Sequence, residues 1–267
     1  MKTALKKYWR HTALAMQETL AYRVTYIVNM FSMVVTYTVI FFVWSAVYAG
    51  NPDLEGYQWQ EMKSYLIVSL FLSSLVSMSS EFRISRQIRT GNIAVELLRP
   101  ADYQKASLAI TLGYSISEGV LIAVSCLGFA LATGATVVPG NALAWLLFIV
   151  SVLLSMATKF LMVYVFGLAS FWTTSLMGIS WLRRGLTDFF SGALIPLALF
   201  PPTLRTVTDW LPFKAIVSIP ANVFTGRLHG EALARDFAVA CIWIAALWLL
   251  GRFVWSRAMR KVTIQGG

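Results

Sequence analysis

The chain has 267 residues, of which 58% are hydrophobic and 13% are charged, and its mean hydropathy is +0.68. Soluble domains carry about 25% charged residues, so this composition excludes a soluble globular protein and predicts an all-α polytopic membrane protein. The formal net charge of +10 does not indicate nucleic-acid binding, because the basic residues cluster at the ends of apolar spans, as in membrane proteins with a cytoplasmic charge bias.

Cysteine and histidine are too few and too scattered to predict a metal site or a disulfide framework. Cys126 and Cys241 both lie inside apolar spans, and His11 and His229 are far apart in the sequence. A membrane enzyme would need reactive side chains gathered at one membrane depth, and the few carboxylates are scattered. We therefore expect no catalytic residue and no metal site in this chain.

Residues 1–23 predict an amphipathic helix on the cytoplasmic face of the membrane. Charged residues run through this segment and leave no apolar core for a signal peptide. Mostly apolar residues recur at three- and four-residue steps, which is typical of a helix that lies in the membrane interface. These residues are Leu5, Tyr8, Trp9, Thr12, Met16 and Leu20. The simplest role for such a helix is to anchor the amino terminus.

The remaining residues, 24–267, predict six membrane spans. An apolar run of about 20 residues crosses a hydrocarbon core about 30 Å thick. Basic residues follow the last span, so six spans place both termini in the cytoplasm and satisfy the positive-inside rule. Apolar runs cover about 24–48, 62–80, 106–132, 141–170 and 233–255, and a further span lies between 171 and 227.

Polar side chains line one face of each of the first two spans. Asn29 and Thr36 belong to a stripe in the first span, which must face protein or water because lipid would leave it unpaired. Ser73 belongs to a serine stripe in the second span, for which close helix packing is favoured over a substrate path.

Two further spans contain ionisable residues. Glu118 lies in the third span and Lys159 in the fourth. A buried ionisable group in a membrane helix is a functional hypothesis by default. A Glu118–Lys159 pair that locks two helices together explains both residues equally well, so both interpretations stay open.

The stretch 83–100 connects the second and third spans on the cytoplasmic side and reads RISRQIRTGNIAVELLRP. It combines four arginines with two apolar patches. Gly91 is typical just past a helix end and Asn92 is typical of the next N-cap, so we expect two short helical pieces along the membrane surface. Such a mixed surface predicts contact with a partner. Its arginines are Arg83, Arg86, Arg89 and Arg99.

The region 171–227 allows two interpretations. In the first, the two arginines at 183–184 form a cytoplasmic turn, and a span follows at 186–200. In the second, the span covers about 173–192, and residues 193–227 form an extracellular re-entrant hairpin rich in proline. Irregular backbone of this kind is tolerated at membrane depth only where protein or a water-filled cavity surrounds it.

Several of these features together resemble a known family. They are the amphipathic amino-terminal helix, the six spans, the loop IRTGNIAVELLRP, and the segment SGALIPLALFPPTL followed by DWLPF. The chain resembles permease subunits of type-2 ABC exporters. Within that family it is most similar to the bacterial subgroup whose permeases are encoded beside a second, related permease and a separate ATPase.

The resemblance implies roles for individual residues. In that family the loop after the second span is the coupling helix that docks in a groove of the ATPase. The family's hairpin before the last span also favours the second interpretation of the fifth span, which places Arg183, Arg184 and Asp188 inside the bundle. Arg184 and Asp188 are then four apart on one helix face. The coupling residues implied are Arg83, Arg86, Arg89, Gly91, Glu96, Leu97 and Arg99.

The main functional hypothesis is a transmembrane permease subunit of an ATP-driven exporter in the cytoplasmic (inner) membrane. The sequence has no G-x-x-x-x-G-K-[ST] phosphate loop, so we expect no cofactor in this chain and ATP with Mg²⁺ on a separate ATPase dimer. A second permease, either related or a second copy, is expected to complete the pathway, with membrane lipid around it. Candidate pathway residues are Asn29, Thr36, Ser73, Glu118, Arg183, Arg184 and Asp188.

The alternative hypothesis is an ATP-independent secondary transporter or channel. Such proteins usually show internal repeats with broken helices at matching positions, and this sequence shows no such self-similarity. A stable complex with an ATPase would separate the two hypotheses. The substrate does not follow from the sequence, although the aromatic content of 14% and the apolar surroundings favour an amphipathic or hydrophobic compound.

Overall fold

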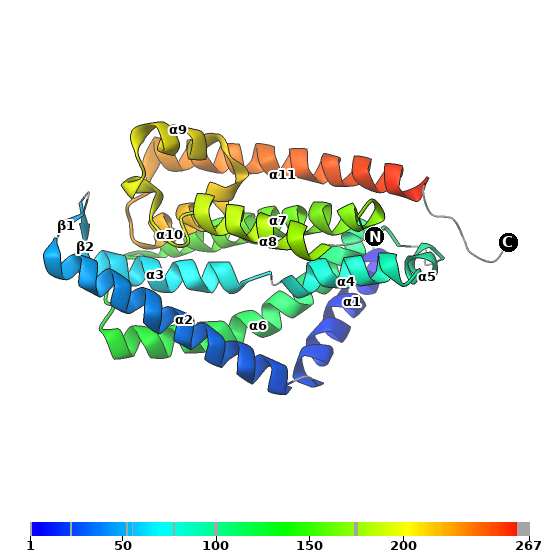
Figure 1. Ribbon diagram of the computed structural model, residues 1–267, viewed down its shortest axis with the longest axis horizontal. Coiled ribbons are helices and arrows are strands. Elements are labelled where there is room, and N and C mark those ends of the chain that lie inside the picture. Colours follow the sequence, from blue (N-terminus) through cyan, green and yellow to red (C-terminus); the bar gives the residue numbers. More distant parts are fainter. Residues whose placement is uncertain are drawn as a thin grey trace.

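The chain folds into an elongated bundle of helices with one two-stranded hairpin (Figure 1). In this computed structural model the described residues are 2–21, 23–51, 53–54, 56–76, 78–98, 101–173 and 176–260. Strand β1 (Asp53–Leu54) pairs antiparallel with β2 (Tyr57–Gln58). The helices of these residues are α1 (Lys2–Ala21), α2 (Arg23–Gly50), α3 (Trp59–Ser74), α4 (Met78–Arg89), α5 (Ile93–Leu97), α6 (Tyr103–Thr133), α7 (Ala142–Leu168), α8 (Leu176–Phe190), α9 (Pro202–Trp210), α10 (Ser218–Phe224) and α11 (Gly230–Met259).

Within the described residues, four helices are long and apolar enough to cross a membrane, and they correspond to the predicted first, third, fourth and sixth spans. Local signals set their ends. The Asp102 side chain accepts from the Lys105 N–H at the start of α6, and Asn141 caps α7 in the same way through the Ala144 N–H. Gly134 ends α6 in the left-handed conformation, with φ of 64°. The four candidate spans are Met30–Gly50, Tyr103–Thr133, Ala142–Phe171 and Gly230–Met259.

The predicted second span, 62–80, is not one continuous helix. The chain forms α3 and α4 with an interruption after Ser74, and Val76 lies there with φ of 55°. A β-branched residue rarely adopts this left-handed conformation, so packing around the interruption must hold it. Helix α4 extends from Met78 through the first predicted helical piece of 83–100, so Arg83 lies inside a longer helix than expected.

The long helix within 171–227 is α8, and its bounds agree with those of the helix in the second interpretation. Helix α8 ends at Phe190, and Gly192 follows with φ of 84°. A side chain at Gly192 would place its Cβ 2.8 Å from the Tyr65 hydroxyl, so this close turn requires glycine. A turn at 183–184 followed by a span at 186–200 is therefore wrong. A helix that crosses a membrane needs about 20 residues, whereas α3 has 16 residues and α8 has 15. Helix length alone therefore does not identify these two as membrane spans.

Residues 193–227 fold back into the bundle instead of forming an open loop. They comprise the 3-10 helices Leu197–Leu199 and Pro212–Ala215 together with α9 and α10. Helix α10 packs against α3 and α7, and its Ala221 is fully buried. Lys214 joins the segment to α11, with its ammonium 2.6 Å from Asp209 and 2.9 Å from Asp236.

The two ends of the bundle carry different elements (Figure 1). The start of α1, helix α5 and the end of α11 lie at one end. The β1–β2 hairpin, α9 and α10 lie at the other. The large buried side chains between the ends come mainly from α3 and α7; they include Met62, Tyr65, Leu72, Phe160 and Tyr164.

Helix α1 forms as predicted, and it packs on the protein through small side chains. It lies along α6, where the Thr12 hydroxyl donates to the Ala109 carbonyl at 2.9 Å. Ala15 and Thr19 are buried on the same side, whereas Trp9 of the predicted apolar face is 63% exposed. Small side chains allow the two backbones to approach closely, so they and not the aromatic residues face α6.

Candidate functional site

The connection between α4 and α5 has the predicted break at Gly91. Helix α4 ends at Arg89, and Gly91 adopts the left-handed conformation with φ of 73°. Asn92 does not act as the predicted N-cap. Its backbone is helical, with φ of −62° and ψ of −13°, and its side chain makes no capping hydrogen bond.

The α4–α5 connection presents both apolar and basic side chains on its surface. Val95, Leu97 and Leu98 are 53%, 45% and 85% exposed, whereas Ile93 is buried and orients the short helix. Arg86, Arg89 and Gly91 are exposed and Glu96 is half-buried, while Arg99 lies outside the described residues. Helix α5 and the end of α4 that precedes it lie at one end of the bundle (Figure 1).

Arg83 departs from the prediction because it points into the protein. Its Nη1 donates to Gln87 Oε1 at 3.4 Å, and the same oxygen accepts from the Tyr103 hydroxyl at 2.8 Å. The Nε and Nη2 atoms of Arg83 are buried and have no hydrogen-bond partner among the described residues. Helical spacing places residue 83 one turn before Gln87, on the inner face of α4.

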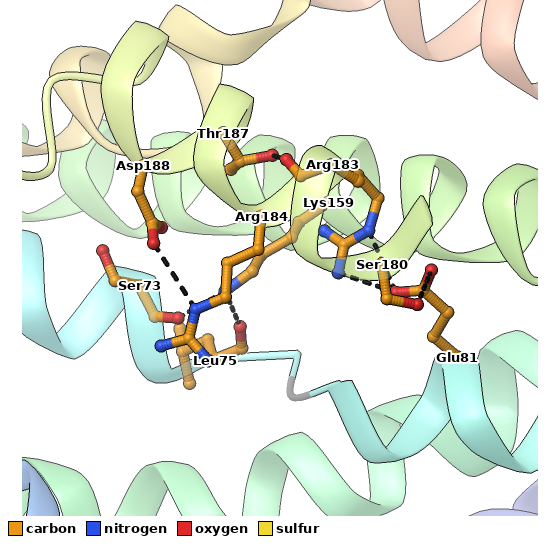
Figure 2. Close-up of polar contacts among 9 residues, drawn as sticks. All are labelled: Ser73, Leu75, Glu81, Lys159, Ser180, Arg183, Arg184, Thr187 and Asp188. Atoms are coloured by element: carbon orange, nitrogen blue, oxygen red, sulfur yellow. Dashed lines mark hydrogen bonds and ion pairs between the residues drawn. The ribbon is translucent and has the colours of Figure 1, made fainter. Parts of the chain in front are cut away.

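The interruption between α3 and α4 is held by a lysine from α7 (Figure 2). The Lys159 ammonium donates to the carbonyl oxygens of Leu72 at 3.5 Å and Ser73 at 2.5 Å, and also to that of Leu75. The last carbonyls of a helix lack partners within it and carry the negative end of its dipole, so a cation is favourable there. Neither sequence interpretation of Lys159 included this anchor on α3.

The beginning of α4 is held by two residues of α8 (Figure 2). Glu81 lies in the first turn of α4 and is fully buried. Its Oε2 accepts from Arg183 Nη2 at 2.7 Å and Nε at 3.0 Å, and its Oε1 accepts from the Ser180 hydroxyl at 2.8 Å. A carboxylate is favourable at a helix amino terminus. Each of the two helix ends at the interruption is therefore matched by a charge of the appropriate sign.

Comparison with protein families decides what kind of membrane protein this is. The sequence model of a family described as "ABC-2 family transporter protein" matches residues 22–266. The chain belongs to the ABC-2 transporter family. It is thus a membrane permease of the ABC transporter type, and the family resemblance seen in its sequence is confirmed. A comparison with curated proteins gave no match.

The ABC-2 permease carries a second charged pair on the same helix as Arg183. Arg184 Nε lies 3.4 Å from Asp188 Oδ2, as the four-residue spacing predicted, and the side chains are 53% and 34% exposed. The Arg184 guanidinium also lies 5.9 Å from the Trp181 ring centre. Adjacent arginines therefore occupy opposite environments, with Arg183 buried and Arg184 at the surface of α8.

The structure of the ABC-2 permease gathers only some of the candidate pathway residues. Ser73, Arg183, Arg184 and Asp188 lie around Lys159 at the interruption (Figure 2). Thr36 bonds within α2, where its hydroxyl donates to the Ser32 carbonyl at 2.9 Å. Of the other two candidates, Glu118 is partly buried on α6, and the Asn29 side chain lies outside the described residues.

Sequence reasoning missed Glu81 and Ser180. Glu81 follows the predicted second span directly and precedes the arginines of the loop, so the sequence pattern indicates an ordinary charged residue of a polar segment. A carboxylate just after a Ser-Ser pair is, however, a signal for the first turn of a new helix. Ser180 gave no signal, because its partner is 99 residues away in the sequence.

Proposed function

We propose that this ABC-2 permease is the membrane subunit of an ATP-driven exporter and forms half of its substrate pathway. In this proposal the 83–100 segment docks on a separate ATPase dimer that binds ATP and Mg²⁺. A second permease, related or identical, supplies the other half of the pathway. The complex lies in the cytoplasmic (inner) membrane, with both termini in the cytoplasm, and carries an amphipathic or hydrophobic substrate outward.

The observation that supports this proposal best is the exposed surface of the α4–α5 connection. Val95, Leu97 and Leu98 are exposed beside Arg86 and Arg89. Exposed apolar residues next to arginines are typical of a protein interface. Helix α4 leads from this surface directly to the interruption at Lys159, so a partner that moves α5 acts on the middle of the bundle.

The proposed topology has six spans. Helices α3 and α4 together form the second span, and α8 forms the fifth. Irregular backbone within these spans is compatible with a membrane because protein surrounds it at the interruption. Residues 193–227 lie on the extracellular side and return into the bundle through α10. Arg257 and Arg260 at the opposite end support a cytoplasmic carboxyl terminus.

The exposed pair on α8 supports a pathway along this helix. Arg184 and Asp188 are partly exposed, and lipid does not accommodate an ion pair without a large cost. We therefore infer that this face of α8 meets water or the second permease. The remaining pathway candidates keep their proposed role, and they are Asn29, Thr36, Ser73, Glu118 and Arg183.

Purification from the native membrane in mild detergent tests the proposal directly. We expect an ABC ATPase and a second permease to remain bound to this chain. If the chain purifies alone or only with itself, and nucleotide has no effect on it, an ATP-independent transporter becomes the better explanation.

A pair of matched variants tests the docking surface. Leu97→Glu places a carboxylate in the proposed interface, whereas Val138→Glu makes the same kind of change at a residue that is 60% exposed between α6 and α7. Loss of one central interface side chain costs about 2 kcal/mol, which is roughly a 30-fold weaker complex. We expect Leu97→Glu to reduce the ATPase that copurifies and to uncouple transport, with normal membrane insertion. A bulky residue of opposite character at Glu96 should also uncouple transport, and equal effects of Leu97→Glu and Val138→Glu would contradict the assignment.

A further inference from the structure

The interruption between α3 and α4 has two sides that are held by different helices (Figure 2). On the α3 side, Lys159 of α7 binds the last carbonyls of the helix. On the α4 side, Arg183 and Ser180 of α8 bind the Glu81 carboxylate. The polar contacts on the two sides of the interruption therefore come from two different helices, although α4 also packs closely against α7.

The backbone conformation at the interruption separates α3 from α4. Val76 lies between them in a left-handed conformation, and no regular helix can pass through such a residue. Strained residues of this kind persist where surrounding contacts hold them, and they often occur at switch positions. Here Lys159 supplies that contact on the α3 side.

The attachment of α4 to α8 differs in kind from its attachment to α7. Against α7, α4 makes an apolar contact in which Ile84 fits closely beside Gly167, where an added Cβ would lie 3.2 Å from Ile84. Apolar contacts are non-directional and allow small sliding movements. The Glu81–Arg183 pair uses two parallel hydrogen bonds from one guanidinium and is buried, so its geometry is directional.

We propose that the Glu81–Arg183 ion pair is the mechanical link that transmits movement of the α4–α5 connection to α8. Movement of α5 tilts α4 about the interruption, and the ion pair displaces α8 together with its exposed Arg184–Asp188 face. Lys159 keeps the end of α3 bound to α7 through its ammonium during this movement. This inference rests on the proposed function, since it assumes that an ATPase moves the 83–100 segment.

The test measures maleimide labelling of single cysteines in inverted membrane vesicles of the native cell, with and without ATP and Mg²⁺. The native cysteines are first replaced. One reporter is Thr90→Cys, at the exposed residue just after α4, and the other is Gly185→Cys, on the exposed surface of α8. Position 185 accepts a side chain because nothing lies within 4 Å of an added Cβ.

The decisive variant is the double substitution Glu81→Gln with Arg183→Gln. It removes both charges and keeps two side chains that can hydrogen-bond, so it avoids an uncompensated buried charge that would unfold the protein. Its matched control is Glu61→Gln with Arg227→Gln, which removes a 2.7 Å ion pair near the β1–β2 hairpin at the other end of the bundle.

We expect ATP to change the labelling rate at both reporters in the parent protein and in the control. In the Glu81→Gln, Arg183→Gln protein we expect the change at position 90 to remain and the change at position 185 to be lost. The link is overturned if position 185 still responds in that protein, if position 90 also stops responding there, or if position 185 never responds in the parent. An unresponsive position 90 in the parent protein would contradict the coupling role itself, so this result distinguishes failure of the proposed function from failure of the link.

Discussion

The adjacent arginines of α8 give a stability prediction in which the exposed Arg184 serves as the control for the buried Arg183. Arg183 is 3% exposed and binds a fully buried carboxylate, whereas Arg184 is half exposed and lies 3.4 Å from a partly exposed one. Arg183→Gln leaves the Glu81 charge buried without its cation. Arg184→Gln leaves the Asp188 carboxylate partly exposed, so its charge is not buried.

The structure sets very different magnitudes for the two substitutions. Removal of one partner of a buried ion pair costs about 3–5 kcal/mol, because the remaining charge is uncompensated. An exposed pair at four-residue spacing contributes less than about 1 kcal/mol. At about 2–4 °C per kcal/mol for a chain of this size, Arg183→Gln should lower Tm by roughly 6–20 °C. Arg184→Gln should lower it by less than about 4 °C.

The measurement is the Tm of the purified protein in one detergent. Samples are heated, and Tm is obtained from the loss of the monodisperse peak in size-exclusion chromatography. The double variant Glu81→Gln with Arg183→Gln should recover most of the lost stability, because it leaves no buried charge. Equal decreases in Tm for Arg183→Gln and Arg184→Gln would contradict the assigned cost of the buried charge. A double variant that is no more stable than Arg183→Gln alone would contradict it as well.

Three further predictions follow from other contacts. Lys159→Met leaves the last carbonyls of α3 without their donor and should destabilise the protein by about 1–3 kcal/mol for each group left unpaired, seen as a lower Tm; an unchanged Tm would contradict the anchoring role. Gly113→Ala places a Cβ 2.4 Å from a backbone oxygen of α1 and should make α1 sensitive to limited proteolysis, whereas Gly128→Ala, with nothing within 4 Å of the added Cβ, should leave α1 protected. Partial burial raises the pKa of the Asp102 carboxyl, but its hydrogen bonds at the start of α6 and the Arg252 guanidinium more than offset this effect and hold the pKa below its ordinary value of 3.8. The stabilisation by Asp102 is therefore complete above that pH and is lost as the pH falls through the lower folded value, so the difference in Tm between wild type and Asp102→Asn should disappear in acid, and a constant difference would contradict it.

Local sequence patterns were sufficient wherever a short stretch decides its own structure. The apolar runs predicted the long helices because the length and hydropathy of a span are properties of neighbouring residues. Gly91 marked the break between α4 and α5, because a positive φ strongly favours glycine. The four-residue spacing of Arg184 and Asp188 likewise predicted their contact.

Patterns failed where a longer-range contact overrode them. The apolar run 62–80 has the composition of one helix, and neither Val76 nor its neighbours is a helix breaker such as proline or glycine. The contact of α1 with α6 was likewise not predicted, because it depends on how closely Thr12 and Ala15 approach Gly113. In both cases the deciding partner lies on another helix.

Sequence patterns were enough to recognise a helical membrane permease, to locate its long apolar helices, and to place a basic and apolar segment with a glycine break after the predicted second span. The interruption between α3 and α4, with Lys159 on one side and Glu81 on the other, became visible only in the folded chain. Those contacts join residues 87 and 102 positions apart in the chain. The spacing of residues along one helix gives the direction of a side chain, but the partner of a buried charge is set by how separate helices pack, and no local pattern records that.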